Sequence, residues 1–229
     1  MSYILVWDIE TTAVEGEICE LGCSRVEVGS GKALDWWSEF VLYDGEMDVQ
    51  ALATHHIAPQ RIRKYGMPFA SALHMMPTSG DVVANCAHNA AFEMSYLKGR
   101  APIFDLPWIC TMKCAMTLMP DLPSFSNQVV RYSIGTCGPE DAAADPPHRA
   151  GPDAYVTAHT LRHFLQTTSV ERLIEISANP VRLKRISFGK HVGTEFDKLP
   201  RDYLSWIVKQ QDMDPNVLHS ARCVLEGSR

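Results

Sequence analysis

Apolar positions near the N-terminus form three extended runs. Residues 3–9 are an apolar run interrupted by Asp8, and two longer runs follow at residues 17–28 and 34–42. Gly29-Ser30-Gly31 marks a tight turn between the second and third runs. Strands joined by short turns pair with their neighbours, so the pattern predicts an antiparallel meander of three strands.

The rest of the chain alternates between helical and extended patterns. Strands are predicted over residues 81–87 and 108–111, and helices over residues 48–56, 59–65, 69–76, 90–97, 111–119, 124–134 and 153–166. Residues 135–152, rich in proline and glycine, are predicted to be a loop that ends with Pro152 as the first helical residue. The order predicts an α/β fold, a mixed sheet with an antiparallel meander and parallel strands flanked by helices.

Charge divides the chain into two parts. Residues 1–60 are rich in acids, whereas residues 182–201 carry six basic residues against two acidic ones, and the net charge is −6. A negative net charge argues against a nucleic acid partner, but an acidic half suited to metals and a basic tail suited to phosphates weaken that objection. A solvated surface without such a role is the alternative. We predict one main domain over residues 1–178 and a small basic subdomain over residues 179–229.

Composition indicates a cytoplasmic protein with no membrane partner. No stretch approaches the roughly 20 apolar residues that a membrane helix needs. The N-terminal apolar run has no basic flank or cleavage site, so it is not read as a signal peptide. Seven cysteines form no C-x-x-C pair, which favours reduced and mostly buried thiols over a disulfide or zinc framework.

Asp8 and Glu10 end the first predicted strand. Side chains alternate across a strand, so these two carboxylates point the same way. Such a pair persists most easily beside a cation, and oxygen ligands favour Mg²⁺ or Mn²⁺. Two solvated acids at a surface strand end are the alternative.

Two further motifs carry groups suited to the same chemistry. In residues 88–93, His-Asn-Ala-Ala-Phe-Glu, Glu93 falls in a first helical turn, where the helix dipole favours an acid regardless of function. In residues 148–153, His-Arg-Ala-Gly-Pro-Asp, Asp153 opens a helix and His148 lies in the preceding loop. A histidine with a near-neutral pKa can accept a proton from an attacking water, although loop histidines without a partner are common.

In this order the three motifs resemble the DEDDh superfamily of 3′→5′ exonucleases, over about residues 3–166. A further likeness, to the bacterial exonuclease X family, rests on Trp-Ile-Cys-Thr-Met-Lys at residues 108–113, and on Phe188-Gly189-Lys190 with the segment 199–206. The resemblance implies an RNase H-like fold and an exonuclease domain over residues 1–178. It also implies hydrolysis of DNA from the 3′ end to 5′-mononucleotides.

The resemblance implies a site with two Mg²⁺ ions, Mn²⁺ being possible, in which Asp8 bridges both. Their ligands would be Asp8, Glu10, Glu93 and Asp153, with His148 as the general base. The family pattern usually has Asp where this chain has Glu93. The longer side chain could still reach the second metal, or it could weaken that site and shift the preference towards Mn²⁺.

Single-stranded or duplex DNA 3′ ends are the expected partner. The predicted substrate-binding residues are Thr11, Thr12, His56, Ile57, Asn89 and Lys190. A helix-end histidine pair is the alternative reading of His55-His56, and solvated loops are the alternative for Lys190 and its basic neighbours. Tyr203 and Trp206 share a helix face and are predicted to pack in the subdomain's own core.

Two other functions remain open from the sequence. One is an exoribonuclease on the same fold, because no residue is recognisable as a reader of the 2′-hydroxyl. The other is a catalytically weak module that binds nucleic acid ends, with Glu93 as its defect.

Overall fold

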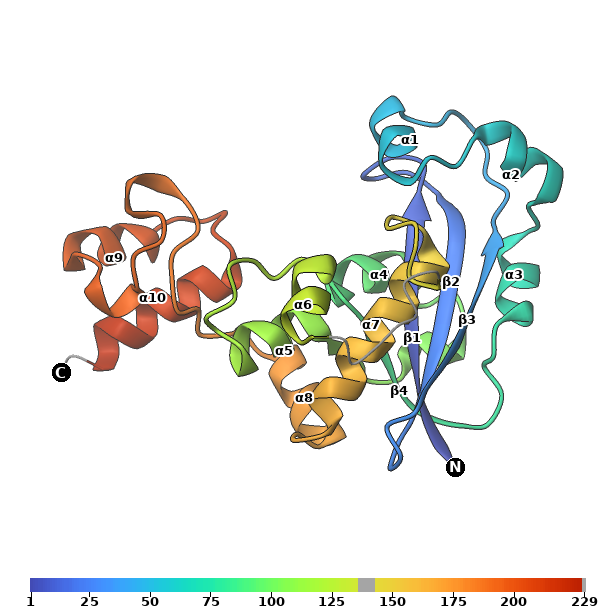
Figure 1. The fold of residues 1–229 in the computed structure, drawn as a ribbon. Coiled ribbons are helices and arrows are strands. Elements are labelled where there is room, and N and C mark those ends of the chain that lie inside the picture. Colours follow the sequence, from blue (N-terminus) through green and yellow to red (C-terminus); the bar gives the residue numbers. More distant parts are fainter. Residues whose placement is uncertain (136–142, 228–229) are drawn as a thin grey trace.

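A five-stranded sheet in the order β3-β2-β1-β4-β5 forms the centre of the molecule (Figure 1). The computed structural model describes residues 1–135 and 143–227, apart from the side chains of residues 34 and 35. The strands are β1 (Ser2–Thr11), β2 (Ile18–Glu27), β3 (Ala33–Phe40), β4 (Asp81–Ala87) and β5 (Trp108–Cys110). Pairing is antiparallel between β1 and β2 and between β2 and β3, whereas β4 runs parallel to β1 and β5. The predicted mixed sheet is confirmed.

The first seven helices lie close to their predicted ranges, whereas no range was predicted for the last three. They are α1 (Val49–His55), α2 (Pro59–Tyr65), α3 (Phe69–Met75), α4 (Ala90–Leu97), α5 (Thr111–Leu118), α6 (Asn127–Ser133), α7 (Ala150–Leu165), α8 (Val170–Ala178), α9 (Arg201–Ile207) and α10 (Pro215–Gly227). Short 3-10 helices cover Pro102–Asp105, Gly189–His191 and Phe196–Lys198. Within the described residues, no helix combines the length and apolar character that crossing a membrane requires.

Helix α7 begins earlier than predicted. Pro152 was expected as its first residue, but the helix starts at Ala150, with Arg149 as the N-cap. The first N–H groups of a helix have no acceptor within it, so a proline in third position loses no hydrogen bond. Asp153 stays in the first turn, as predicted. Residues 136–142 of the predicted loop lie outside the described residues.

Helices cover both faces of the sheet. Ile4 of β1 belongs to a buried cluster that includes Leu161 of α7. The alternate residue Trp7 belongs to a cluster on the other face, with Leu97 of α4. Even-numbered residues of β1 therefore face α7, and this is the face on which positions 8 and 10 lie.

The last part of the chain has a hydrophobic core of its own. We call residues 182–227 the C-terminal module; α9 and α10 pack together there, away from the sheet (Figure 1). Its buried cluster consists of Ile186, Phe196, Leu199, Leu204, Ile207, Val217 and Ala221. This separate core supports the predicted boundary between residues 178 and 179, which stays a prediction.

The described cysteines agree with the prediction of reduced thiols. Cys19, Cys23, Cys86, Cys110 and Cys114 are free and buried, and Cys223 is free and half-buried. Cys137 lies outside the described residues.

Candidate active site

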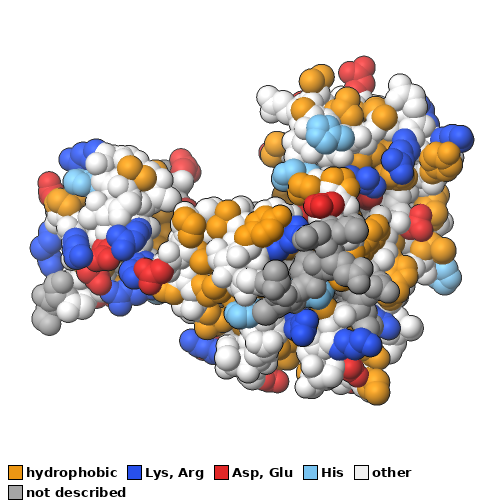
Figure 2. Space-filling model, in the orientation of Figure 1, with side chains coloured by type: hydrophobic (Ala, Val, Ile, Leu, Met, Phe, Trp, Pro, Cys, Tyr) orange, Lys and Arg blue, Asp and Glu red, His pale blue; other side chains and the backbone are white. Residues whose placement is uncertain are grey.

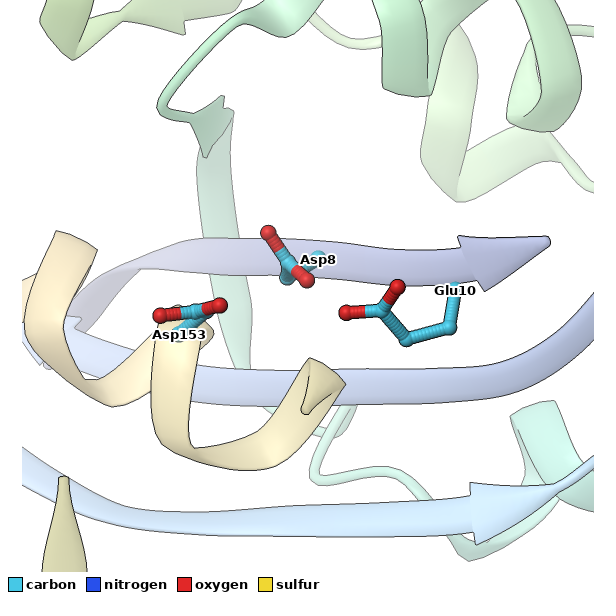
Figure 3. A group of neighbouring side chains, drawn as sticks. All are labelled: Asp8, Glu10 and Asp153. Carbon is cyan, nitrogen blue, oxygen red and sulfur yellow. The ribbon is translucent and has the colours of Figure 1, made fainter. Parts of the chain in front are cut away.

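Three carboxylates meet where β1 ends beside the start of α7 (Figure 3). Asp8 and Glu10 come from β1, and Asp153 comes from the first turn of α7. One oxygen of each lies within 4.8 Å of the others. Side chains separated by more than 140 positions in the sequence therefore form one cluster of oxygen ligands.

Two glycines allow α7 to approach the sheet this closely. Gly22 of β2 lies opposite Asp8, and a Cβ there would lie 2.2 Å from the carbonyl carbon of Ala150. A Cβ on Gly151 would lie 2.2 Å from a ring atom of Trp36. The start of α7 therefore rests directly on β2 and β3, which places Asp153 next to Asp8.

The carboxylates of this cluster resist ionisation together. Burial, and then the charges of Glu10, Glu93 and Asp153, raise the pKa of Asp8 well above its usual value. Burial and the neighbouring Glu20 and Asp153 raise the pKa of Glu10 to about 8. Burial also raises the pKa of Asp153, against the opposing effect of a hydrogen bond from the His148 backbone. A divalent cation among these oxygens would offset the repulsion, and an all-oxygen donor set suits Mg²⁺ or Mn²⁺.

Glu93 lies near this cluster, but it is not one of the three carboxylates whose oxygens lie within 4.8 Å of one another. Its side chain projects from the first turn of α4 and is 4% exposed. Its Oε2 is buried and has no hydrogen-bond partner among the described residues, and burial raises its pKa to about 8. An unpartnered buried carboxylate oxygen fits a cation ligand, so the predicted ligand role of Glu93 stays a prediction with this support.

His148 is held beside Asp153 through its backbone. Its N–H donates to Asp153 Oδ2 at 2.7 Å, while its imidazole is exposed. The residue adopts a left-handed conformation, with φ of 59°. Gln128 of α6 donates to the other oxygen, Asp153 Oδ1, at 3.2 Å. The carboxylate is thus fixed from two sides, and the imidazole is left free to meet a ligand.

Thr11 and Thr12 use their hydroxyls within the loop that follows β1. The Thr11 hydroxyl donates to the Ala13 carbonyl at 2.8 Å, and the Thr12 hydroxyl accepts from the Glu17 N–H at 2.9 Å. Both residues are buried. The structure therefore assigns these side chains to shaping the loop, and their substrate contacts stay predictions.

The histidine pair at the end of α1 divides into a buried and an exposed member. His55 is buried, and its Nδ1 accepts the Ile57 N–H at 3.0 Å; burial lowers the pKa of His55. His56 is exposed in a left-handed conformation. The Ile57 side chain is 2% exposed and packs with Cys19 and Ile62. Of the two predicted substrate contacts, His56 and Ile57, His56 is therefore the accessible one.

The remaining predicted contacts lie in two separate places. Asn89 is exposed and is the N-cap of α4, four positions before Glu93. Its carbonyl accepts the Phe92 N–H, and its side chain makes no capping hydrogen bond. Lys190 lies in the C-terminal module, with its Nζ 5.7 Å from the centre of the Tyr203 ring.

Comparison with solved structures decides the fold. Exonuclease X in complex with 5′-overhanging duplex DNA is 28% identical, the match covers 77% of this chain and 99% of that one, and the TM-score is 0.59. E. coli exonuclease I with a dA16 oligonucleotide is 16% identical over 76% of this chain and 42% of its own, with a TM-score of 0.57. The nuclease domain of 3′hExo, a DEDDh family member bound to rAMP, is 14% identical over 72% and 92%, with a TM-score of 0.53. This chain has the 3′-exonuclease fold.

The exonuclease fold agrees with the RNase H-like architecture predicted from the motifs. Exonuclease I and 3′hExo are similar in fold alone, whereas the likeness to exonuclease X extends to the sequence. No protein-family model matches the chain, and a search of curated proteins found no match.

Two residues that contact the candidate site were missed by the sequence analysis. Gln128 binds the Asp153 carboxylate, and Glu20 binds the guanidinium of Arg149, next to His148. Glu20 carried a usable signal, because a single acid inside the otherwise apolar run 18–23 needs a buried partner. Gln128 carried none, since a glutamine in a helix is ordinary.

Removing metal should make the stability of this protein depend on pH in a defined direction. The pKa values of Glu10 and Glu93 are raised from 4.5 to about 8 in the folded protein. The folded state therefore holds more protons than the unfolded chain between these values, and the stabilisation present at low pH is lost as the pH rises through about 8. A bound divalent ion should reverse this loss, because it favours the ionised carboxylates.

Thermal melts measure this effect. With EDTA, Tm should fall from about pH 6 to about pH 9, and excess MgCl₂ or MnCl₂ should raise Tm more at the higher pH. Equal stabilisation at both pH values would contradict the assignment of these carboxylates as the ligands.

Proposed function

We propose that this chain is a metal-dependent 3′→5′ exonuclease that hydrolyses DNA from the 3′ end and releases 5′-mononucleotides. The observation that carries the proposal is the convergence of Asp8, Glu10 and Asp153 at the end of β1, with His148 beside them. The 28% identity to exonuclease X, solved with duplex DNA, supports the same activity and substrate class.

Asp8, Glu10 and Asp153, together with Glu93, would hold the divalent ions, and we propose two of them. Bound ions would supply an activated water and positive charge against the attacking and leaving oxygens. The chain's own part is to keep the carboxylate oxygens close together in a place where they repel each other without a cation. Burial, and then the charges of neighbouring carboxylates, raise the pKa values of Asp8 and Glu10.

His148 would act as the general base. Its imidazole takes the proton of the attacking water as the new P–O bond forms. The bond from phosphorus to the 3′-oxygen of the preceding nucleotide breaks, and that oxygen leaves as the new 3′-hydroxyl after gaining a proton from solvent. The backbone hydrogen bond from His148 to Asp153 keeps the base at the site, and the exposure of the imidazole lets it reach a phosphate.

End-labelled oligonucleotides test this function. Stepwise shortening of 5′-labelled single-stranded or duplex DNA, in the presence of Mg²⁺ or Mn²⁺ and abolished by EDTA, is the expected result. Shortening of RNA alone would replace the proposal by an exoribonuclease, a reading favoured by the fold shared with 3′hExo bound to rAMP. Binding without shortening under either metal would leave the end-binding module.

Mutation of Glu93 tests whether this residue, where the family pattern usually has Asp, is a metal ligand. In Glu93→Gln, we expect the concentration of Mg²⁺ or Mn²⁺ needed for half-maximal activity to rise about 10-fold, because a buried carboxylate beside the ions is lost. Glu171→Gln is the matched control, since Glu171 also occupies a first helical turn but is exposed on α8. Metal requirements that are the same in both variants would remove Glu93 from the ligand set.

The basic residues of the C-terminal module are more neutralised than the sequence suggested. Within the described residues, Arg182 pairs with Asp197, Lys184 with Asp121, and Arg185 and Lys198 with Glu195. Basic and acidic side chains are accordingly mixed on this part of the surface (Figure 2). A broad phosphate-binding tail is therefore not what the module presents.

The module does present an exposed aromatic surface. Trp206 was predicted to lie in the core, but it is 47% exposed and stacks on Tyr203, with ring centroids 5.5 Å apart. Helix α9 is on the module's surface and Leu204 and Ile207 take the buried positions, which leaves position 206 on the open side. With Lys190 above Tyr203, this surface suits a stacked base and a phosphate. We propose that the C-terminal module grips the substrate strand at this aromatic surface.

Replacing Trp206 tests the grip. In Trp206→Ala we expect KM for a long oligonucleotide to rise about 10-fold, in line with one lost base–aromatic stack, with kcat unchanged. A dinucleotide, too short to reach the module, should be hydrolysed as by the wild type. Tyr65→Ala is the control, because Tyr65 is exposed and lies 4.9 Å from Lys64 Nζ, but on α2. Equal KM values in both variants would refute the grip.

A further inference from the structure

Glu20 and Arg149 form a two-point ion pair beside the proposed site, in which the Glu20 side chain is buried and the Arg149 side chain is 20% exposed. Arg149 Nε donates to Glu20 Oε2 at 2.9 Å, and a terminal nitrogen of the same guanidinium donates to Oε1 at 2.6 Å. The Ala150 N–H also donates to Oε2 at 3.0 Å, and the Ser38 hydroxyl donates to Oε1 at 3.2 Å. Glu20 is 1% exposed. Among the described residues, the hydrogen bonds to this carboxylate come from the start of α7 and from β3.

The pair fixes the chain at the point where it passes from His148 into α7. Arg149 is the N-cap of the helix, yet its side chain makes no capping bond and reaches to β2 instead. Glu20 lies opposite Glu10 in the pairing of β1 with β2, so the anchor is one strand away from the carboxylate cluster. Glu20 thus sets the distance between the strand that carries Glu10 and the turn that carries His148.

The conformation of His148 requires such an anchor. A φ of 59° is uncommon for a residue with a side chain, and it persists only where the surroundings impose it. The hydrogen bond from the His148 N–H to Asp153 holds one side of the residue, and the clamp of Arg149 on Glu20 holds the other. Loss of either would let the loop relax and carry the imidazole away from the carboxylates.

Stability alone does not account for this pair. The cost of desolvating two charges commonly cancels their attraction, so a neutral pair of similar size in the same place folds about as well. A bidentate contact of guanidinium on carboxylate instead fixes direction as well as distance, which a single-point contact from lysine does not. A general base must be oriented towards the water from which it takes a proton.

We infer that Glu20 and Arg149 are positioning residues. They hold His148 and the first turn of α7, which carries Asp153, at the distance from β1 that turnover requires. The inference rests on the proposed nuclease function for its kinetic consequence. The position of the loop itself is measurable without activity.

The sharpest test removes both charges at once. The double variant Glu20→Gln, Arg149→Met leaves no unpaired buried charge, so its Tm should stay close to that of the wild type. We expect its kcat to fall about 100-fold, the order expected for a displaced reacting group, with KM unchanged. The same substitutions in the exposed pair Arg172→Met, Glu175→Gln serve as the control and should change neither quantity.

Amide hydrogen exchange of residues 148–153 provides the readout that does not need turnover. We expect faster exchange there in the double variant and unchanged exchange in the control. A wild-type kcat in the double variant overturns the inference, and so does a lower kcat with unchanged exchange, because the pair would then act through its charge.

A wild-type chain without nuclease activity would refute the proposed function and leave the exchange experiment to decide. Faster exchange would still support the positioning role, and unchanged exchange would overturn it.

Discussion

Asp8→Asn should abolish nuclease activity while leaving the protein folded. Asp8 lies in the middle of the cluster, and its pKa is raised by burial and then by the charges of Glu10, Glu93 and Asp153. Replacing it removes the ligand that we place between both ions, so kcat should fall by at least about 1000-fold, equivalent to about 4 kcal/mol of lost transition-state stabilisation. Asp8→Ala should give the same loss.

The same substitution should raise the stability of the metal-free protein. An amide of the same size removes one of several carboxylates that repel each other, so Tm in EDTA should equal or exceed that of the wild type at neutral pH. The rise in Tm on adding Mg²⁺ or Mn²⁺ should disappear. Loss of activity together with unfolding would leave the ligand role undecided, which is why the melts accompany the assay.

Glu27→Gln is the matched control for this prediction. Glu27 lies on β2 at the opposite end of the sheet, paired with Tyr3, and its carboxylate contacts only the exposed hydroxyl of Ser30 among the hydrogen bonds of the described residues. The activity of Glu27→Gln and its rise in Tm on adding metal should match those of the wild type. An active Asp8→Asn variant would refute the assignment of Asp8 as a ligand.

The sequence was sufficient to predict the parts of the site that depend on local periodicity. Alternation along a strand requires residues 8 and 10 to share a face, and a helical start at Pro152, as predicted, or at Ala150, as observed, places Asp153 in the first turn. Both are properties of short segments with one regular structure. The antiparallel meander of the first three strands followed in the same way, because short turns join them.

The rest of the site depends on distances that no local pattern encodes. The contact of Glu20 with Arg149 joins residues 129 positions apart, and it exists because Gly22 and Gly151 let α7 rest on the sheet. The position of Glu93, near the cluster but outside its closest set, depends on where α4 begins relative to β1. Neither can be read from spacing along the chain.

The C-terminal module shows the same limit for charge and burial. The run of basic residues looked like a phosphate-binding tail, but acids from within the module and from the 120–126 region neutralise most of it. The helical spacing of Tyr203 and Trp206 correctly placed the two rings together, but it gave no information on whether that face points inward. Burial depends on which face meets the rest of the fold, and that is settled in three dimensions.

His148→Ala should reduce kcat by about 100-fold to 10,000-fold, the usual contribution of a positioned general base. Because the imidazole is exposed, the space it vacates is open to solvent. Added imidazole should therefore restore part of the activity.

The response to metal distinguishes the role of His148 from that of the carboxylate ligands. His148 touches Asp153 through its backbone N–H, which alanine retains, so His148→Ala should keep the full rise in Tm on adding Mg²⁺ or Mn²⁺. Asp8→Asn should lose both turnover and this response, whereas His148→Ala should lose turnover alone. His74→Ala, at an exposed histidine of α3, should lose neither. An activity of His148→Ala within about threefold of the wild type would exclude a general base that contributes on this scale.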